Sequence, residues 1–169
     1  MKKTLTILSV VLLAAGGLFA QSTKDLTMTV NLSAWYDLSL SAASISFTDV
    51  APTAAAAPAT ASIAANEGAI NVRAFAVTEK GKKLSLTVKA NGDLVSGSDT
   101  IGIGAISWAS TGSGYVDGAM AASNVTAGSW SGSILHWHEG TFTYSFLRDY
   151  TTQTPGSYTA TATYTLSVI

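Results

Sequence analysis

The segment from Leu26 to Leu40 constrains the fold more than any other part of the chain, because apolar and mostly polar residues alternate along it. Its apolar positions are Leu26, Met28, Val30, Leu32, Ala34, Tyr36, Leu38 and Leu40. A period of two gives an extended chain one apolar face and one polar face. At about 3.3 Å per residue the segment would span roughly 50 Å, although strands usually have about 3–10 residues. We therefore expect it either to bend from one sheet into another or to pair, in its first part, outside its own domain.

The last segment, Ser157–Ile169, alternates in the same way. Tyr164, Leu166 and Val168 lie on its apolar face, and threonines occupy most of the other. The first and last strands are therefore natural partners, within one subunit or between two. Near Ala42 the first alternation changes phase, since the next large apolar residues, Ile45 and Phe47, are odd-numbered. A bulge or bend is expected there.

Between these ends we predict further strands and no helix. Ala69–Val77 and Leu84–Ala90 are expected to form a hairpin, and Glu139-Gly140 is expected to be the two-residue turn of another. The Gly-, Ser- and Ala-rich stretch Ala109–Ser133 is interpreted mostly as a long surface excursion. About eight to ten strands with Gly/Pro turns indicate an all-β fold, an antiparallel β-sandwich of the Ig-like or jelly-roll type.

The N-terminus has the features of a secretory signal peptide: a basic start, the apolar run Leu5–Ala15 and the small residue Ala20 before Gln21. The run is too short for an ordinary membrane span of about 20 residues. The predicted organisation is a signal peptide at 1–20, an N-terminal strand at 21–33 that could be donated to a neighbour, and one β-sandwich domain at 34–169. The predicted location is extracellular.

Composition narrows the function. Without residues 1–20 the chain has seven basic and ten acidic side chains, and charged residues are only 11% of the sequence. The chain has no basic patch, which argues against nucleic acid as a partner. No later apolar stretch is long enough to span a membrane after signal removal. The chain has no cysteine and hence no disulfides. Low charge favours self-association.

The final segment, Thr154–Leu166, carries a Pro-Gly pair, Tyr158-Thr159 and a threonine-rich strand. It resembles the last strand of bacterial secreted surface domains of the spore-coat-U-like and WxL types, and pilin-like Ig-type subunits share the general layout. The resemblance covers about this one strand and implies an exported Ig-like sandwich at a bacterial surface. The Trp-x-Leu signature of WxL domains is missing, so cell-wall binding is not carried over.

Candidate chemical groups are few. His136 and His138 project from the same face of a strand and could ligate zinc or copper; the alternative is an exposed pair beside a turn. We find no nucleophile–base signature and no Gly-x-Ser-x-Gly elbow, so an enzyme is not expected. No cofactor is predicted.

Two functions remain open. In the first, the chain is an exported structural subunit of a pilus, fimbrium, other fibre or surface layer, which associates with itself or with other surface proteins. Leu26, Met28, Val30 and Leu32 would fill a neighbour's groove by strand addition. Alternatively, that strand stays in its own monomeric sandwich. The second function is a secreted carbohydrate- or ligand-binding module using Trp108, Trp130 and Trp137, although large aromatics more often fill cores.

Overall fold

A computed structural model describes residues 24, 26–33, 35–50, 58–77, 81–131 and 137–169. The chain divides into two units, Met1–Leu32 and Ser33–Ile169. In the first unit, the described residues form neither helix nor strand. In the second, the described residues form ten strands, all paired in antiparallel fashion. The predicted all-β antiparallel sandwich is thereby confirmed.

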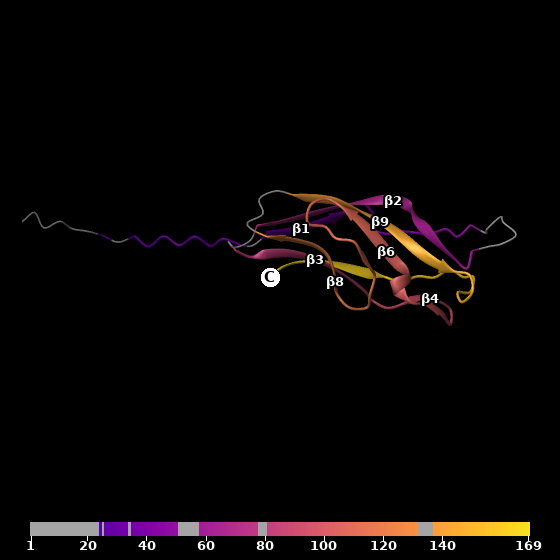
Figure 1. Cartoon of the computed structure of the whole chain (residues 1–169). Coiled ribbons are helices and arrows are strands. Elements are labelled where there is room, and N and C mark those ends of the chain that lie inside the picture. The colour runs from indigo at the N-terminus through magenta and orange to yellow at the C-terminus, as the bar shows by residue number, and fades with distance from the viewer. Residues whose placement is uncertain (1–23, 25, 34, 51–57, 78–80, 132–136) are drawn as a thin grey trace, which may run out of the picture. The chain divides into compact units, whose positions relative to one another are not determined.

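Two sheets make the layers of this sandwich, and Figure 1 shows β2, β9 and β6 side by side in one layer and β3 and β8 in the other. The larger sheet has the order β1-β2-β9-β6-β7, with β1 at Trp35–Leu40, β2 at Thr60–Val77, β9 at His138–Asp149, β6 at Ile106–Thr111 and β7 at Gly118–Ala119. The smaller sheet has the order β10-β3-β8, with β10 at Ala162–Val168, β3 at Lys83–Ala90 and β8 at Val125–Ser131. A separate pair consists of β4 at Leu94–Ser96 and β5 at Asp99–Ile101, and the short 3-10 helix η1 follows at Ile103–Ala105.

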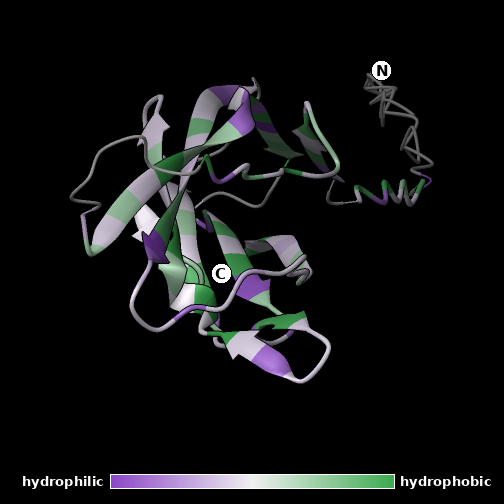
Figure 2. Ribbon diagram, turned by 90° about the vertical axis from the view of Figure 1, so that its right-hand side faces the viewer, coloured by the Kyte–Doolittle hydropathy of each residue, from purple (hydrophilic) through white to green (hydrophobic). Residues whose placement is uncertain are grey.

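The core lies between the layers and is built from alternate residues of the strands, which appear as bands of opposite hydropathy in Figure 2. Val72 on β2, Leu84 and Leu86 on β3, and Phe142 on β9 are fully buried. Tyr144 on β9 and Tyr164 on β10 join the layers by a hydrogen bond between their hydroxyls. Burial raises the pKa of both phenols, so they stay protonated donors at neutral pH.

The opening segment is a shorter strand than its alternation predicts. Of the described residues in this segment, Trp35–Leu40 pair with another strand, and 26–33 do not form a strand. The predicted phase change is confirmed: Leu38 and Leu40 pack against the core on the even side, and Ile45 and Phe47 do so on the odd side. The apolar residues at 26–32 are exposed and do not belong to this core.

The predicted hairpin between Ala69–Val77 and Leu84–Ala90 is wrong, because β2 and β3 belong to different sheets. β2 is already paired on both edges, with β1 on one side and β9 on the other. It also begins at Thr60, earlier than the sequence predicts, and its pairing with β9 is interrupted by a bulge between Ala64 and Ala69. The chain therefore turns between β2 and β3 without pairing these two strands, because each pairs with strands of its own sheet.

The predicted turn at Glu139-Gly140 is also wrong, because β9 runs unbroken from His138 to Asp149. A Cβ at Gly140 would collide with the carbonyl oxygen of Thr111 and the ring of Tyr115. Glycine in a strand interior often marks such a close approach. Gly140 therefore makes room for Tyr115, whose hydroxyl lies within hydrogen-bond distance of the Val72 and His138 carbonyl oxygens.

The predicted excursion at Ala109–Ser133 is corrected too, since it contains β7 and the core strand β8. Its small residues surround a large ring. A Cβ at Gly128 would lie 2.5 Å from Cη2 of Trp130, and one at Gly114 would collide with the same indole. The glycines are therefore needed to seat Trp130 and do not indicate a surface loop.

Candidate functional site

A groove of about 460 Å³ opens between β1 and β10, the first and last strands of the sandwich. These strands do not pair with each other, contrary to what their patterns suggest within one subunit; each pairs with another strand instead. No charged residue lines the groove, whose lining consists of Leu38, Leu40, Ala42, Ala43, Ala162, Thr163 and Tyr164. Five of the seven lining residues are leucine or alanine, and such an uncharged groove can accept apolar side chains.

Among the described strands, none pairs with the backbone edge of β10 on the groove side, because β10 ends the three-stranded sheet. Ile169 and Lys83 exchange both backbone hydrogen bonds, and the register continues without a shift to Ala162 opposite Ala90. In an antiparallel ladder such exchanging pairs alternate along the strands. The odd-numbered residues of β10 therefore bond to β3, while the even-numbered residues, Ala162 to Val168, direct their N–H and C=O groups away from it.

The edge of β1 has the same character. β1 pairs only with β2 within the described sheets, and Ser41 N–H donates to the Asn71 carbonyl oxygen in the same register. The backbone groups of Tyr36, Leu38 and Leu40 therefore point toward the open side. The side chains of Leu38 and Leu40 are half-buried and pack on the core. The groove thus has unpaired backbone along both rims and an apolar floor.

The sequence-predicted assembly residues have the opposite property, since they are apolar and exposed. Leu26, Met28, Val30 and Leu32 are 77–90% exposed. Single exposed apolar residues are ordinary on protein surfaces, but contiguous groups often mark an interaction site. Four in strict alternation would present one continuous apolar face if the segment were extended.

Two of the three tryptophans predicted to bind a ligand lie in the core instead. Trp108 and Trp130 are only 3% and 6% exposed. Each indole N–H donates to a backbone carbonyl oxygen, that of Val116 at 2.9 Å and that of Ser113 at 2.7 Å. Neither ring can stack on a sugar, because its faces are covered by neighbouring side chains such as Phe142 and Tyr115.

Trp137 is half-buried and belongs to an aromatic cluster that the sequence did not reveal. Its ring packs against Phe75, which in turn contacts the exposed ring of Trp35. The guanidinium of Arg73 lies 4.5 Å from the centre of the Trp137 ring and forms an ion pair with Glu139. Because β1, β2 and the chain before β9 supply these residues, only sheet pairing could have identified the cluster.

The histidine pair is only partly within the described residues. His136 lies outside them, while His138 begins β9 and stacks on the buried Trp130 ring with 4.9 Å between ring centres. Within the described ranges, no group of three or more His, Cys, Asp or Glu side chains is arranged to hold a metal ion. The metal hypothesis therefore gains no third ligand from the described part of the chain.

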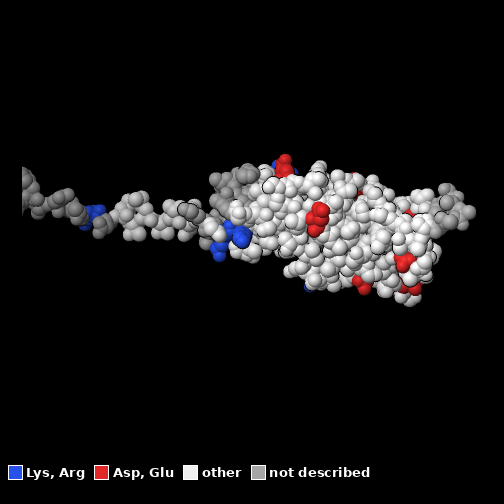
Figure 3. Space-filling view, in the orientation of Figure 1, with Lys and Arg blue, Asp and Glu red and all other residues white. Residues whose placement is uncertain are grey.

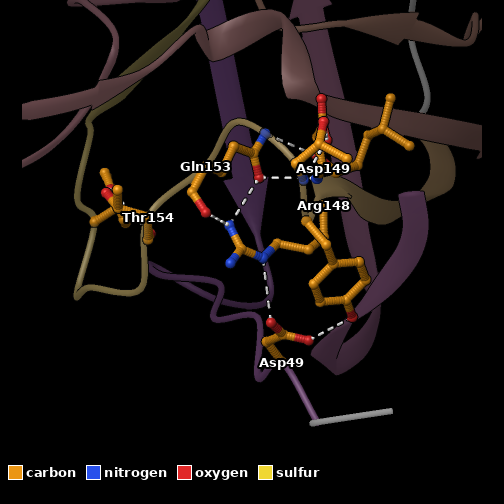
Figure 4. Close-up of polar contacts among 9 residues, drawn as sticks. Asp49, Arg148, Asp149, Gln153 and Thr154 are labelled. Carbon is orange, nitrogen blue, oxygen red and sulfur yellow. Dashed lines mark hydrogen bonds and ion pairs between the residues drawn. The ribbon is translucent and has the colours of Figure 1, made fainter. Parts of the chain in front are cut away.

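A cluster of polar side chains lies where β9 ends, and Asp49, Arg148, Asp149 and Gln153 belong to it (Figure 4). The buried guanidinium of Arg148 donates from Nε to Asp49 at 3.2 Å and from Nη1 to the Gln153 carbonyl oxygen at 2.8 Å. The other carboxylate oxygen of Asp49 accepts from the Tyr150 hydroxyl. These bonds tie the chain before β2 to the turn after β9, which is a structural role.

The carboxylate of Asp149 closes the adjoining turn. It accepts hydrogen bonds from the backbone N–H and hydroxyl of Thr151 and from the hydroxyl of Thr152. These donors favour the charged form, the Thr151 hydroxyl most, and lower the pKa of Asp149 to about 2. The acid is thus permanently ionised at neutral pH and holds the turn.

In the described part of the chain, helices with the length and apolar character to span a bilayer are not found. Comparison of the sequence with protein-family models and with curated proteins finds no match. The resemblance of the last strand to secreted surface domains therefore remains an expectation from the sequence.

Proposed function

We propose that this protein is an exported bacterial structural subunit that assembles into an extracellular fibre or surface layer by donating residues 26–32 to a neighbouring copy. One observation carries the proposal: four alternating apolar side chains, Leu26, Met28, Val30 and Leu32, are exposed, while the sandwich keeps an uncharged groove with unpaired rims among the described strands. A free strand and a free edge are the two components of strand addition.

Three further points support it. The signal-peptide pattern of residues 1–20 predicts export. Charged residues are few, and Figure 3 shows them sparsely distributed on the face in view, so charge repulsion between copies is weak. A head-to-tail contact between a donated segment and a groove elsewhere on the next copy does not close on itself and therefore propagates into filaments.

Sugar binding by the predicted tryptophans has less support, because Trp108 and Trp130 are core residues here. Only Trp137 of the three could offer part of its ring to a ligand. The assembly proposal uses residues whose exposure otherwise has no role.

The test exploits the two faces of the donated segment. The chain beginning at Gln21 is purified with Met28→Asn and Val30→Asn, which change the apolar face. The matched control carries Thr27→Asn and Thr29→Asn, which change the polar face. All four positions are exposed, so each pair should leave the free energy of unfolding within about 0.5 kcal/mol.

Negative-stain microscopy and size-exclusion chromatography give the outcome. The unaltered chain and the polar-face control should form filaments or large oligomers, and the apolar-face variant should remain monomeric. A monomeric unaltered chain, or equal assembly of the two variants, would refute the proposal.

A further inference from the structure

We infer that the acceptor is the free edge of β10 in a second copy of this chain, and that residues 26–32 pair with it antiparallel in one register, Leu26 opposite Val168 and Leu32 opposite Ala162. This inference rests on the proposed function and specifies its partner surface.

The edges of the two main sheets differ in availability. β8, at the other end of the smaller sheet, is already bridged along its outer side, where Val116 N–H donates to the Ala127 carbonyl and Ser129 N–H to that of Gly114. β7, at the far end of the larger sheet, has only two residues. This leaves β1 and β10, which flank the groove.

Layer width favours β10 over β1. The sheet containing β1 has five strands and the sheet containing β10 has three. The inward side chains of β1, Leu38 and Leu40, are consequently only half-buried and line the groove. A strand added to β10 would widen the narrow layer and cover these two leucines. A strand added to the free edge of β1 would extend the wider layer instead.

The side-chain phase matches this placement. The even-numbered residues of β10 direct their backbone groups to the free edge, and the even-numbered Tyr164 points into the sandwich, where it meets Tyr144. Residues directly opposite each other in an antiparallel pair place their side chains on the same face. An even-numbered donor residue opposite an even-numbered β10 residue therefore directs its side chain inward.

The lengths match as well. β10 is seven residues long, as is the donor segment 26–32. With Leu26 opposite Val168, Met28 falls opposite Leu166 and Val30 opposite Tyr164. All four apolar donor side chains then face the groove, and the polar donor residues Thr27, Thr29 and Asn31 face solvent beside the exposed Thr163 and Thr165.

The same phase argues against a tight hairpin that would fold the segment back onto the chain's own β1. A two-residue hairpin at 33–34 would place Leu32 opposite Trp35 on the edge of β1. Trp35 is exposed on the outer face, so Leu32, Val30 and Met28 would also face solvent. A second copy meets no such restriction.

Cysteine cross-linking tests this register in the full chain from Gln21, which contains no cysteine of its own. Thr29 and Thr165 would form a non-hydrogen-bonded pair on the solvent face, with Cα atoms about 4.5 Å apart, a separation that a disulfide can bridge. The Thr29→Cys/Thr165→Cys variant is assembled, treated with a two-electron oxidant and analysed on a non-reducing gel. We expect a ladder of covalent multimers that a reducing agent collapses to monomer.

Two matched variants probe the other edges: Thr29→Cys/Ser39→Cys reports on β1, and Thr29→Cys/Ser129→Cys on β8, both at exposed positions. Neither should give more than dimers. Mixing a Thr29→Cys chain with a Thr165→Cys chain should give a dimer that contains one of each, since the bond is between copies.

The outcomes separate the two proposals. If filaments form but the gel ladder appears with the Ser39→Cys or Ser129→Cys variant, or with none of the three variants, the β10 register is overturned and strand donation still stands. A disulfide between the cysteines at positions 29 and 165 of the same monomer would show that the segment occupies its own β10 edge, which would refute the second copy as the occupant. Failure of the unaltered chain to assemble would refute the proposed function, and this inference with it.

Discussion

Two arginine–carboxylate pairs in this protein test how burial determines the contribution of an ion pair to the free energy of unfolding. Arg73 and Glu139 are the closer pair at 3.0 Å, but their side chains are 47% and 65% exposed. Arg148 and Asp49 are 3.2 Å apart, and the Arg148 side chain is only 10% exposed. Distance alone ranks the first pair as stronger, whereas burial and additional hydrogen bonds rank the second as stronger.

The substitution Arg148→Met keeps much of the apolar stem and removes the guanidinium. It breaks the bond to Asp49 and the bond to the Gln153 carbonyl. Breaking a fully buried pair costs about 3–5 kcal/mol. Because Asp49 is partly exposed and can regain water, we discount this to about 2–3 kcal/mol. The loss includes looser attachment of the chain before β2 to the turn after β9.

The matched substitution Arg73→Met removes an exposed ion pair and the contact of the guanidinium with the Trp137 ring. Such a pair contributes about 0–1 kcal/mol, and an exposed cation–π contact about 0.5–1 kcal/mol. We therefore expect a loss of roughly 1 kcal/mol.

Urea denaturation followed by tryptophan fluorescence, at a concentration where chromatography shows monomer, gives the free energy of unfolding of each variant. The unaltered chain measured alongside provides the reference. A loss for Arg73→Met equal to or greater than that for Arg148→Met would refute the reasoning from burial.

Two further predictions concern the same sandwich. Gly140→Ala should lower the free energy of unfolding by about 3 kcal/mol, at the upper end of overpacking effects, because its Cβ would meet the Thr111 carbonyl oxygen and the Tyr115 ring. The control Gly102→Ala has open space around its Cβ and should change that free energy by less than about 0.5 kcal/mol. Similar urea midpoints for the two variants would contradict this prediction. The carboxyl of Asp149 has a folded-state pKa of about 2, below its ordinary 3.8, so its stabilising contribution is present above about pH 4 and is lost as the pH falls toward about 2. Acid titration by circular dichroism should show a smaller loss of stability over that window in Asp149→Asn than in the unaltered chain, and identical acid profiles would count against this role.

Residue patterns alone predicted the fold class, which the structure confirms. Alternation over Trp35–Leu40 and Ala162–Val168 recurs as β1 and β10, and the phase change after Ala42 recurs as a switch in which side chains pack on the core. Period-two alternation is a local property that any sandwich must satisfy, because one face of each sheet is buried. The alternation can therefore be recognised in the sequence without knowing which strands pair. The same alternation identified Leu26 to Leu32 as an apolar face.

Tertiary structure decided what the local patterns left ambiguous. Gly140 is a typical turn residue, but it lies inside β9, which pairs with β2 and β6, and Thr111 and Tyr115 approach it too closely for a side chain. Trp108 and Trp130 could be read as surface or core until β6 and β8 placed them inside. The groove exists only because a five-stranded layer faces a three-stranded one. Sheet order is set by long-range pairing, which leaves no local trace in the sequence. The sequence by itself therefore determined the apolar alternation at 26–32, and only the tertiary structure showed which sheet edges are unpaired among the described strands.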